Sequence, residues 1–177
     1  MARSPKNDPQ EQTAYSWENS FTQHGKKLTE KEMRTAIKRA TRIYRVPMVQ
    51  LRCVSKDSRS RKKLMSYYDP NTHLISIRPR HMTLDVALHE AAHAIADWIL
   101  GWDIEIHGPH WLGIYMTLLI KFKVLPQSAL EATALERGLK WTPLWRVSPT
   151  RIRQVHSALF RRARFNHPEE LIEWLAA

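Results

Sequence analysis

The segment from Thr83 to Leu100 constrains the fold of this chain more than any other stretch. Thr83 can accept a hydrogen bond as an N-cap, and Gly101 stands where a helix would end. Between them, apolar side chains recur at helical spacing: Leu84, Leu88, Ala91, Ala92, Ile95 and Ile99. This pattern predicts a helix over 83–100, and we expect a β-sheet to pack against it.

A helix and three strands are predicted ahead of that segment. Thr29 and Glu32 have the spacing of a capping box, which predicts a helix from Leu28 to about Arg45, and Pro47 ends it. The strands are predicted from alternating apolar residues and from a turn sequence at 69–71, and they cover 49–53, Leu64–Tyr68 and Thr72–Arg78. We expect them to form a small antiparallel sheet.

Prolines and apolar spacing predict the remaining organisation. Pro109 suits the first turn of a helix that runs to about Phe122, and two or three more helices are expected, with 127–138, 149–164 and 168–176 as the candidate ranges. The fold class is therefore α+β. Residues 1–27 are expected to be a flexible tail, 28–125 the core, and 126–177 a basic helical extension.

Composition excludes several classes of protein. Cys53 is the single cysteine, which rules out an internal disulfide or a zinc ribbon built from cysteines. The longest apolar run, Trp111 to Ile120, is far shorter than the ~20 residues that span a bilayer. No apolar stretch typical of a secretion signal follows Arg3. We expect a soluble chain without membrane contact, cytoplasmic or associated with the nucleoid.

The net charge of +11 favours an anionic partner such as DNA or RNA. The basic residues gather in two clusters, the first of which is expected at the tip of a hairpin formed by the first two strands. Solvated surface is the alternative interpretation of both. The predicted nucleic-acid contacts are Lys56, Arg59, Arg61, Lys62 and Lys63 in the first cluster, and Arg151, Arg153, Arg161, Arg162 and Arg164 in the second.

The predicted helix 83–100 carries a group of residues that can bind a metal. His89 and His93 are four residues apart, so both imidazoles lie on one helix face and can reach one ion, and Glu90 lies beside them. This is the H-E-x-x-H pattern of the zincins, in which the glutamate is the general base of a zinc peptidase. Two ordinary helix histidines are the alternative.

A catalytic zinc ion needs a third protein ligand and an open position. The metzincin pattern is excluded, because it requires glycine at Ala96 and histidine at Ile99. A glutamate from a later helix could be the ligand, but neither of the two candidates, Glu131 and Glu136, has a supporting local motif. That leaves His107 and His110.

The segment from Leu88 to about Tyr115 resembles the SprT-like, or Spartan, metallopeptidase family, in which H-E-x-x-H precedes H-G-P-x-[FW] at a helix start. The resemblance implies that His107 is the third zinc ligand, that Gly108 and Pro109 shape the turn, and that Trp111 packs beneath the site. It also implies a zincin-like fold and a protein or peptide substrate. The cysteine ribbon of better-known relatives is missing here.

These residues predict a hydrolytic mechanism. Zinc would lower the pKa of a bound water toward ~7, and Glu90 would remove its proton and pass it to the leaving amine. Asp97 could orient a ligand imidazole, and Tyr115 could approach the oxyanion, although an exposed acid and a core tyrosine are the simpler interpretations. Strand 72–78, if at the sheet edge, could pair with substrate. A nucleic-acid-associated protein with a non-catalytic zinc site, and a zinc hydrolase acting on another bond, are the rival hypotheses.

Overall fold

A computed structural model describes residues 10–22, 27–54, 66–100 and 105–143 of the chain. These residues form an α+β fold of five α-helices, one 3-10 helix and one three-stranded sheet, as the sequence predicts for the fold class. Among them, no helix is both long and apolar enough to cross a membrane.

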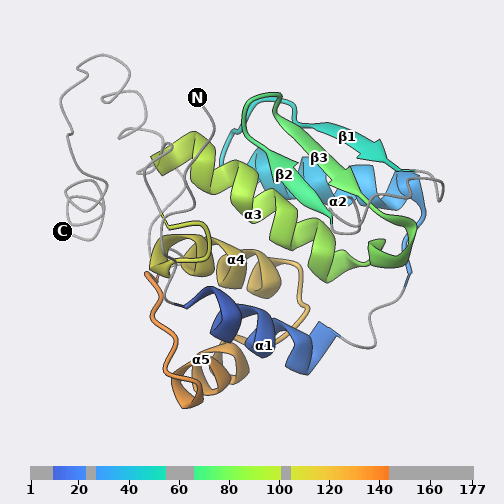
Figure 1. The fold of residues 1–177 in the computed structure, drawn as a ribbon. Helices are drawn as coiled ribbons and strands as arrows, with labels where there is room; N and C mark the ends of the chain where they lie inside the picture. The colour runs from blue at the N-terminus through green and yellow to red at the C-terminus, as the bar shows by residue number, and fades with distance from the viewer. Residues whose placement is uncertain (1–9, 23–26, 55–65, 101–104, 144–177) are drawn as a thin grey trace, which may run out of the picture.

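Helix α3 (Leu84–Leu100) lies in the middle of the molecule, between two layers (Figure 1). On one side are α2 (Glu30–Ile43) and the sheet, and on the other are α1 (Glu11–Thr22), α4 (Pro109–Lys121) and α5 (Gln127–Glu136). Its side chains belong to the apolar cores of both layers. The helix is therefore apolar around most of its circumference, which is what burial on two sides requires.

Helix α2 begins at the predicted capping box. The Thr29 hydroxyl accepts a hydrogen bond from the Glu32 amide at 3.3 Å, and the Glu32 carboxylate accepts one from the Thr29 amide at 2.7 Å. These two bonds satisfy amides that have no partner within the helix. The buried face of α2 includes Met33, Ile37 and Ala40, which fixes the helix on the core.

The sheet is mixed, so the predicted antiparallel sheet is wrong in part. Strands β2 (Tyr67–Asp69) and β3 (Leu74–Ile77) are antiparallel, because a tight turn at Asp69 joins them. Strand β1 (Gln50–Cys53) instead pairs with β3 in parallel, and the order is β1-β3-β2. The connection over 54–66 is long enough to carry the chain to the other sheet edge. There is consequently no hairpin between β1 and β2.

The predicted flexible tail over 1–27 is wrong for residues 11–22, which form α1. Ala14 and Trp17 are buried in the same core as α3 and α4, and the Trp17 indole donates a hydrogen bond to the Thr133 hydroxyl at 2.9 Å. Phe21 packs edge-on against Trp17, with ring centroids 4.8 Å apart. The apolar residues at 14, 17 and 21 are too few to predict a helix from the sequence. One apolar face is nevertheless enough to hold a helix when that face packs on the core of the protein.

Helix α5 also joins this core, through Leu130 and Ala134. The predicted extension over 126–177 therefore has its first helix inside the core. The helices predicted over 149–164 and 168–176 lie outside the described residues.

Candidate metal centre

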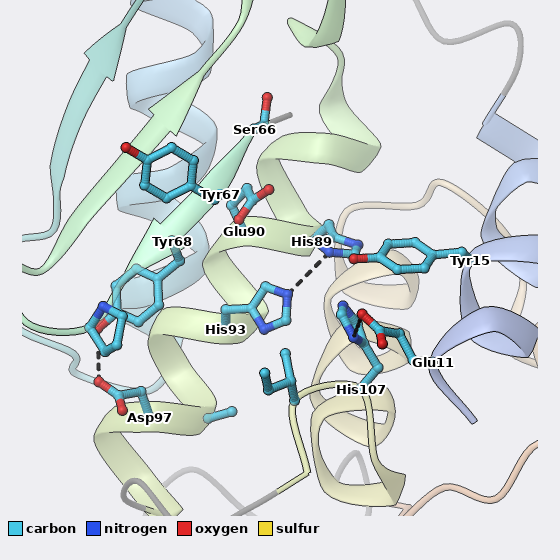
Figure 2. A pocket seen from close by; sticks show the side chains of 13 residues that line it. Glu11, Tyr15, Ser66, Tyr67, Tyr68, His89, Glu90, His93, Asp97 and His107 are labelled. Atoms are coloured by element: carbon cyan, nitrogen blue, oxygen red, sulfur yellow. Dashed lines mark hydrogen bonds and ion pairs between the residues drawn. The ribbon is translucent and has the colours of Figure 1, made fainter. Parts of the chain in front are cut away.

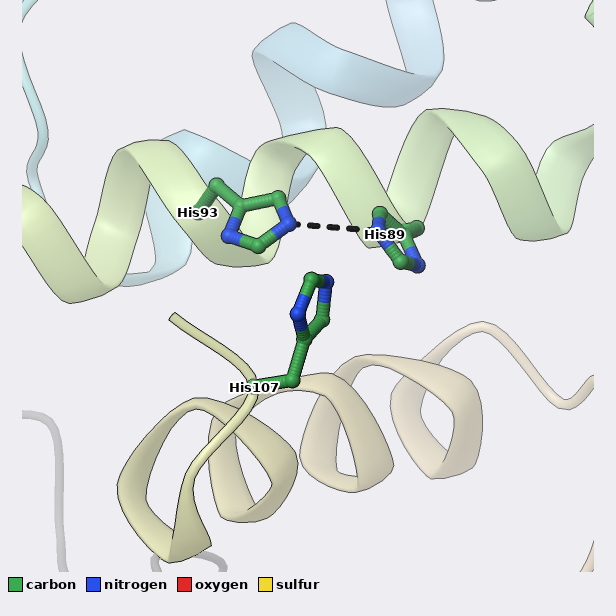
Figure 3. A group of neighbouring side chains, drawn as sticks. All are labelled: His89, His93 and His107. Atoms are coloured by element: carbon green, nitrogen blue, oxygen red, sulfur yellow. Dashed lines mark hydrogen bonds between the residues drawn. The ribbon is translucent and has the colours of Figure 1, made fainter. Parts of the chain in front are cut away.

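Helix α3 presents His89 and His93 on the face turned toward α4 (Figure 3). The spacing of four residues places the imidazoles one turn apart, and their Nε2 atoms are 3.1 Å from each other. His89 is 7% exposed, and His93 is half-buried at the edge of a pocket. Helix geometry thus brings the two nitrogens together, as the sequence predicts.

His107 reaches the same point from the turn that precedes α4. Gly108 is required in this turn, because a Cβ there would lie 2.6 Å from the Glu105 Cβ. Pro109 occupies the first turn of α4, where no amide hydrogen bond is lost. The Gln10 side chain donates a hydrogen bond to the His107 carbonyl at 2.9 Å and so ties the turn to the start of α1.

Together the three histidines could hold a metal ion, since their ligand nitrogens all lie within 4.8 Å of one another. The other three candidates for third ligand are placed elsewhere. His110 shares a hydrogen bond of 2.8 Å with the Thr142 hydroxyl, Glu131 accepts one from Gln127 on α5, and Glu136 is exposed. The cluster therefore contains the three histidines predicted as ligands and none of the alternatives.

Trp111 forms the floor beneath all three imidazoles. Its ring centroid lies 4.8 Å from that of His89, 5.0 Å from that of His93 and 4.6 Å from that of His107. The His93 ring is stacked on the indole, while the other two meet it edge-on or nearly so. The packing beneath the site that the resemblance implies for Trp111 is thus confirmed.

The imidazoles differ in proton affinity when no metal is bound. Burial lowers the pKa of His89, but the charge and hydrogen bond of Glu18, together with the charges of Glu90 and Asp85, outweigh burial, and the pKa rises to about 9. Burial, and then the charge of His89, lowers the pKa of His107 to about 3. A metal ion would therefore meet one protonated and one neutral imidazole at these two positions near pH 7.

Glu90 is 4% exposed and lines the same pocket as the histidines (Figure 2). Its Oε2 atom is buried and has no hydrogen-bond partner among the residues that the structure describes. Burial raises the pKa of Glu90 to about 7, partly offset by the charge of His89. A buried carboxylate oxygen without a partner is costly in a folded protein, so this atom is a candidate for a functional role.

The pocket has a volume of about 230 Å³ and lies between α1 and β2, with α3 as its base (Figure 2). Tyr15 and Glu11 line it from α1, with the Glu11 carboxylate 3.7 Å from His107 Nδ1. Tyr67 and Tyr68 line it from β2, which is an edge strand. The predicted substrate strand, 72–78, contains β3, which is central and has a neighbour on each side. That prediction is wrong, and β2 is the strand beside the pocket.

The simpler interpretation holds for Tyr115, a core residue, but not for Asp97, which is partly buried rather than an exposed acid. Asp97 accepts a hydrogen bond from the Tyr68 hydroxyl at 2.9 Å and lines the pocket. Tyr115 is fully buried, and burial, followed by the charge of Glu18, raises its pKa well above its usual value. Its hydroxyl donates to Glu18 rather than pointing toward the pocket.

Glu18 is the main residue at this site that sequence reasoning missed. Its carboxylate lies 2.9 Å from His89 Nδ1 and accepts a hydrogen bond of 2.6 Å from Tyr115. A signal was available, since Glu11 and Glu18 are two helical turns apart and share a face with Ala14. Separations of 71 and 97 residues nevertheless hide both contacts from any local pattern.

All ten residues predicted to bind nucleic acid lie outside the described ranges, so this contact stays a prediction. Comparisons with models of protein families, with curated proteins and with solved structures found no match to this chain. Its function must therefore be argued from the site itself.

Proposed function

We propose that this chain is a zinc-dependent metallopeptidase of SprT-like type with a zincin-like fold. The observation that carries the proposal is Glu90, a buried carboxylate that is not part of the histidine cluster and has an oxygen without a partner in the pocket those histidines line. A site that only stabilised the fold would have no use for such a group. A general base needs this position.

Zinc fits the donor set better than the hard cations do. Three imidazoles are typical zinc ligands, whereas calcium and magnesium prefer oxygen. Two nitrogen ligands at about 2.0–2.1 Å from a tetrahedral zinc ion are about 3.4 Å apart, and the Nε2 atoms of His89 and His93 are 3.1 Å apart. Three protein ligands also leave one position open, as catalytic sites do and structural sites do not.

The chemistry divides between the ion and the side chains. When bound, zinc would supply Lewis acidity, lowering the pKa of water toward ~7 and polarising a carbonyl group. His89, His93 and His107 would hold it. Glu90 takes the proton from the attacking water and returns it to the amine that leaves, so one carboxylate acts first as base and then as acid.

Strand β2 is proposed to bind the substrate. It is an edge of the sheet, and its residues Tyr67 and Tyr68 line the pocket next to Glu90. An extended peptide can add to such an edge through backbone hydrogen bonds, which suits an enzyme that accepts many sequences. The two basic clusters would keep the enzyme near nucleic acid.

The decisive test is proteolysis by Glu90→Gln, which keeps the size of the side chain and leaves the three imidazoles untouched. Cleavage of casein and of histone, with and without DNA, should fall by at least about a hundredfold, the effect of losing a general base. Zinc content should stay the same. Glu131→Gln, which changes a partly buried carboxylate on α5 that lies outside the cluster, is the matched control and should cleave as wild type does.

Two outcomes would count against the proposal. If Glu90→Gln cleaved as fast as wild type, the chemistry would lie elsewhere. If wild type bound zinc but cleaved no substrate, the rival hypothesis of a nucleic-acid-associated protein with a non-catalytic zinc site would take precedence.

A further inference from the structure

Helix α1 brings a buried carboxylate to the far side of His89. Glu18 is 8% exposed, and it lies on the same helix as Trp17, which is completely buried. The Glu18 Oε2 atom is 2.9 Å from His89 Nδ1, and Oε1 accepts a hydrogen bond of 2.6 Å from the Tyr115 hydroxyl. Residues of α1, α3 and α4 therefore form one hydrogen-bonded chain: Tyr115, Glu18 and His89.

This chain determines which imidazole nitrogen faces the cluster. Because a carboxylate only accepts hydrogen bonds, its partner at 2.9 Å must be an N–H group, so His89 carries a proton on Nδ1. His89 Nε2 is the atom that lies 3.1 Å from His93 Nε2. Glu18 thus leaves Nε2 as the nitrogen that a metal ion would use, and it holds the plane of the ring.

The charge of Glu18 is also placed to favour a cation. A buried carboxylate is expensive unless it is paired with positive charge or with several donors. Among the residues that the structure describes, one hydroxyl and one imidazole donate hydrogen bonds to it. A divalent cation bound at His89 Nε2 would place more positive charge, through the ring, beside the carboxylate than these donors alone provide.

We infer that Glu18 is a positioning residue for the metal ligand His89, and that the docking of α1 and the binding of metal stabilise each other. The inference rests on the metal site of the proposed function and not on peptidase activity. Coupling of this kind is reciprocal: whatever factor a docked α1 adds to metal affinity, the metal adds to the docking of α1. Tyr15 and Glu11 also belong to α1 and line the pocket, so metal binding would hold the α1 side of the pocket in place.

Zinc affinity of the full chain, measured by competition with a chromophoric chelator, tests the positioning role. Glu18→Gln keeps the size of the side chain and removes its charge, and it should weaken zinc binding by about 10-fold to 100-fold, as mutation of the residue behind a metal ligand typically does. Thr133→Val is the matched control, because it removes the acceptor of the Trp17 indole on α1 without touching His89. It should change zinc affinity by less than about threefold.

Amide hydrogen exchange tests the coupling. Zinc should increase the protection of α1 in wild type and in Thr133→Val, and much less in Glu18→Gln. Thermal unfolding in zinc-free buffer shows whether each variant is folded. It also measures the stability of the metal-free chain, which is the quantity that would change if Glu18 had only a structural role. Such a role would lower stability without zinc and leave the zinc affinity of the folded chain as it was.

Unchanged zinc affinity in Glu18→Gln, or equal losses in Glu18→Gln and Thr133→Val, would overturn the inference. Failure of the proposed function looks different, because a chain that binds zinc in this way and cleaves nothing would leave the role of Glu18 intact. A wild-type chain that bound no zinc would overturn the metal site together with this inference.

Discussion

Replacing Trp17 by alanine should destabilise the whole fold. The side chain is completely buried, meets the rings of Phe21 and Tyr115 edge-on, and donates a hydrogen bond to Thr133. Truncating a buried tryptophan costs about 3–5 kcal/mol, the sum of lost apolar burial and of the cavity left behind. Urea unfolding followed by far-ultraviolet circular dichroism, in zinc-free buffer, measures the loss directly.

Two further variants divide this effect into parts. Thr133→Val leaves the packing in place but removes the hydrogen-bond acceptor of the buried Trp17 indole N–H, which should lower the free energy of unfolding by about 1–3 kcal/mol. Asn19→Ala changes an exposed residue of α1 and should stay within about 0.5 kcal/mol of wild type. If Trp17→Ala were as mild as Asn19→Ala, residues 11–22 would not pack on the core, and the placement of α1 beside the metal centre would be refuted.

Three other expectations follow, two from the structure and one from the charge of the sequence. Gly113→Ala would place a Cβ 1.9 Å from the Thr142 carbonyl oxygen and should lower the free energy of unfolding in urea by about 3 kcal/mol. Gly138→Ala should cost about 1 kcal/mol, because its φ of +67° is strained for alanine but its surroundings are open. The reverse order would contradict the packing of Thr142 on α4. Zinc affinity measured by calorimetry should rise about tenfold per pH unit between pH 6.5, the usual pKa of histidine, and about pH 9, the pKa of metal-free His89. In this range zinc must displace the proton of His89. An affinity independent of pH would argue against His89 as a ligand. Binding to DNA or RNA should weaken steeply with salt and show little sequence preference. Charge reversal at Arg161, Arg162 and Arg164 should make the dependence of affinity on salt less steep. A salt-insensitive affinity would contradict the nucleic-acid hypothesis.

The parts of the structure that depend on local spacing could be predicted from the sequence. The capping box at Thr29 marks the start of α2, and the apolar stripe of α3 marks that helix almost to the residue. The same holds for His89 and His93, because four residues along a helix always return to the same face. His107 followed only from the H-G-P-x-W resemblance, since its approach to α3 depends on the path of the loop.

What could not be predicted depends on contacts between distant parts of the chain. Strand β1 alternates as an antiparallel strand would, and only the tertiary fold decides that it runs parallel to β3. Helix α1 shows few apolar residues, so its polar composition suggested a tail. Its helical state comes from packing on α4 and α5 rather than from intrinsic propensity. Glu18 was missed for that reason: its role exists only once α1 is docked.

The zinc content of purified protein after dialysis, measured by mass spectrometry of the metal, tests the central claim most directly. Wild type should hold about one zinc ion per chain. His107→Ala should lose most of it, because one of three ligands in the cluster is gone. His110→Ala should keep it, because that imidazole is bonded to Thr142. Equal loss in both variants, or loss in His110→Ala alone, would contradict a metal centre built from His89, His93 and His107.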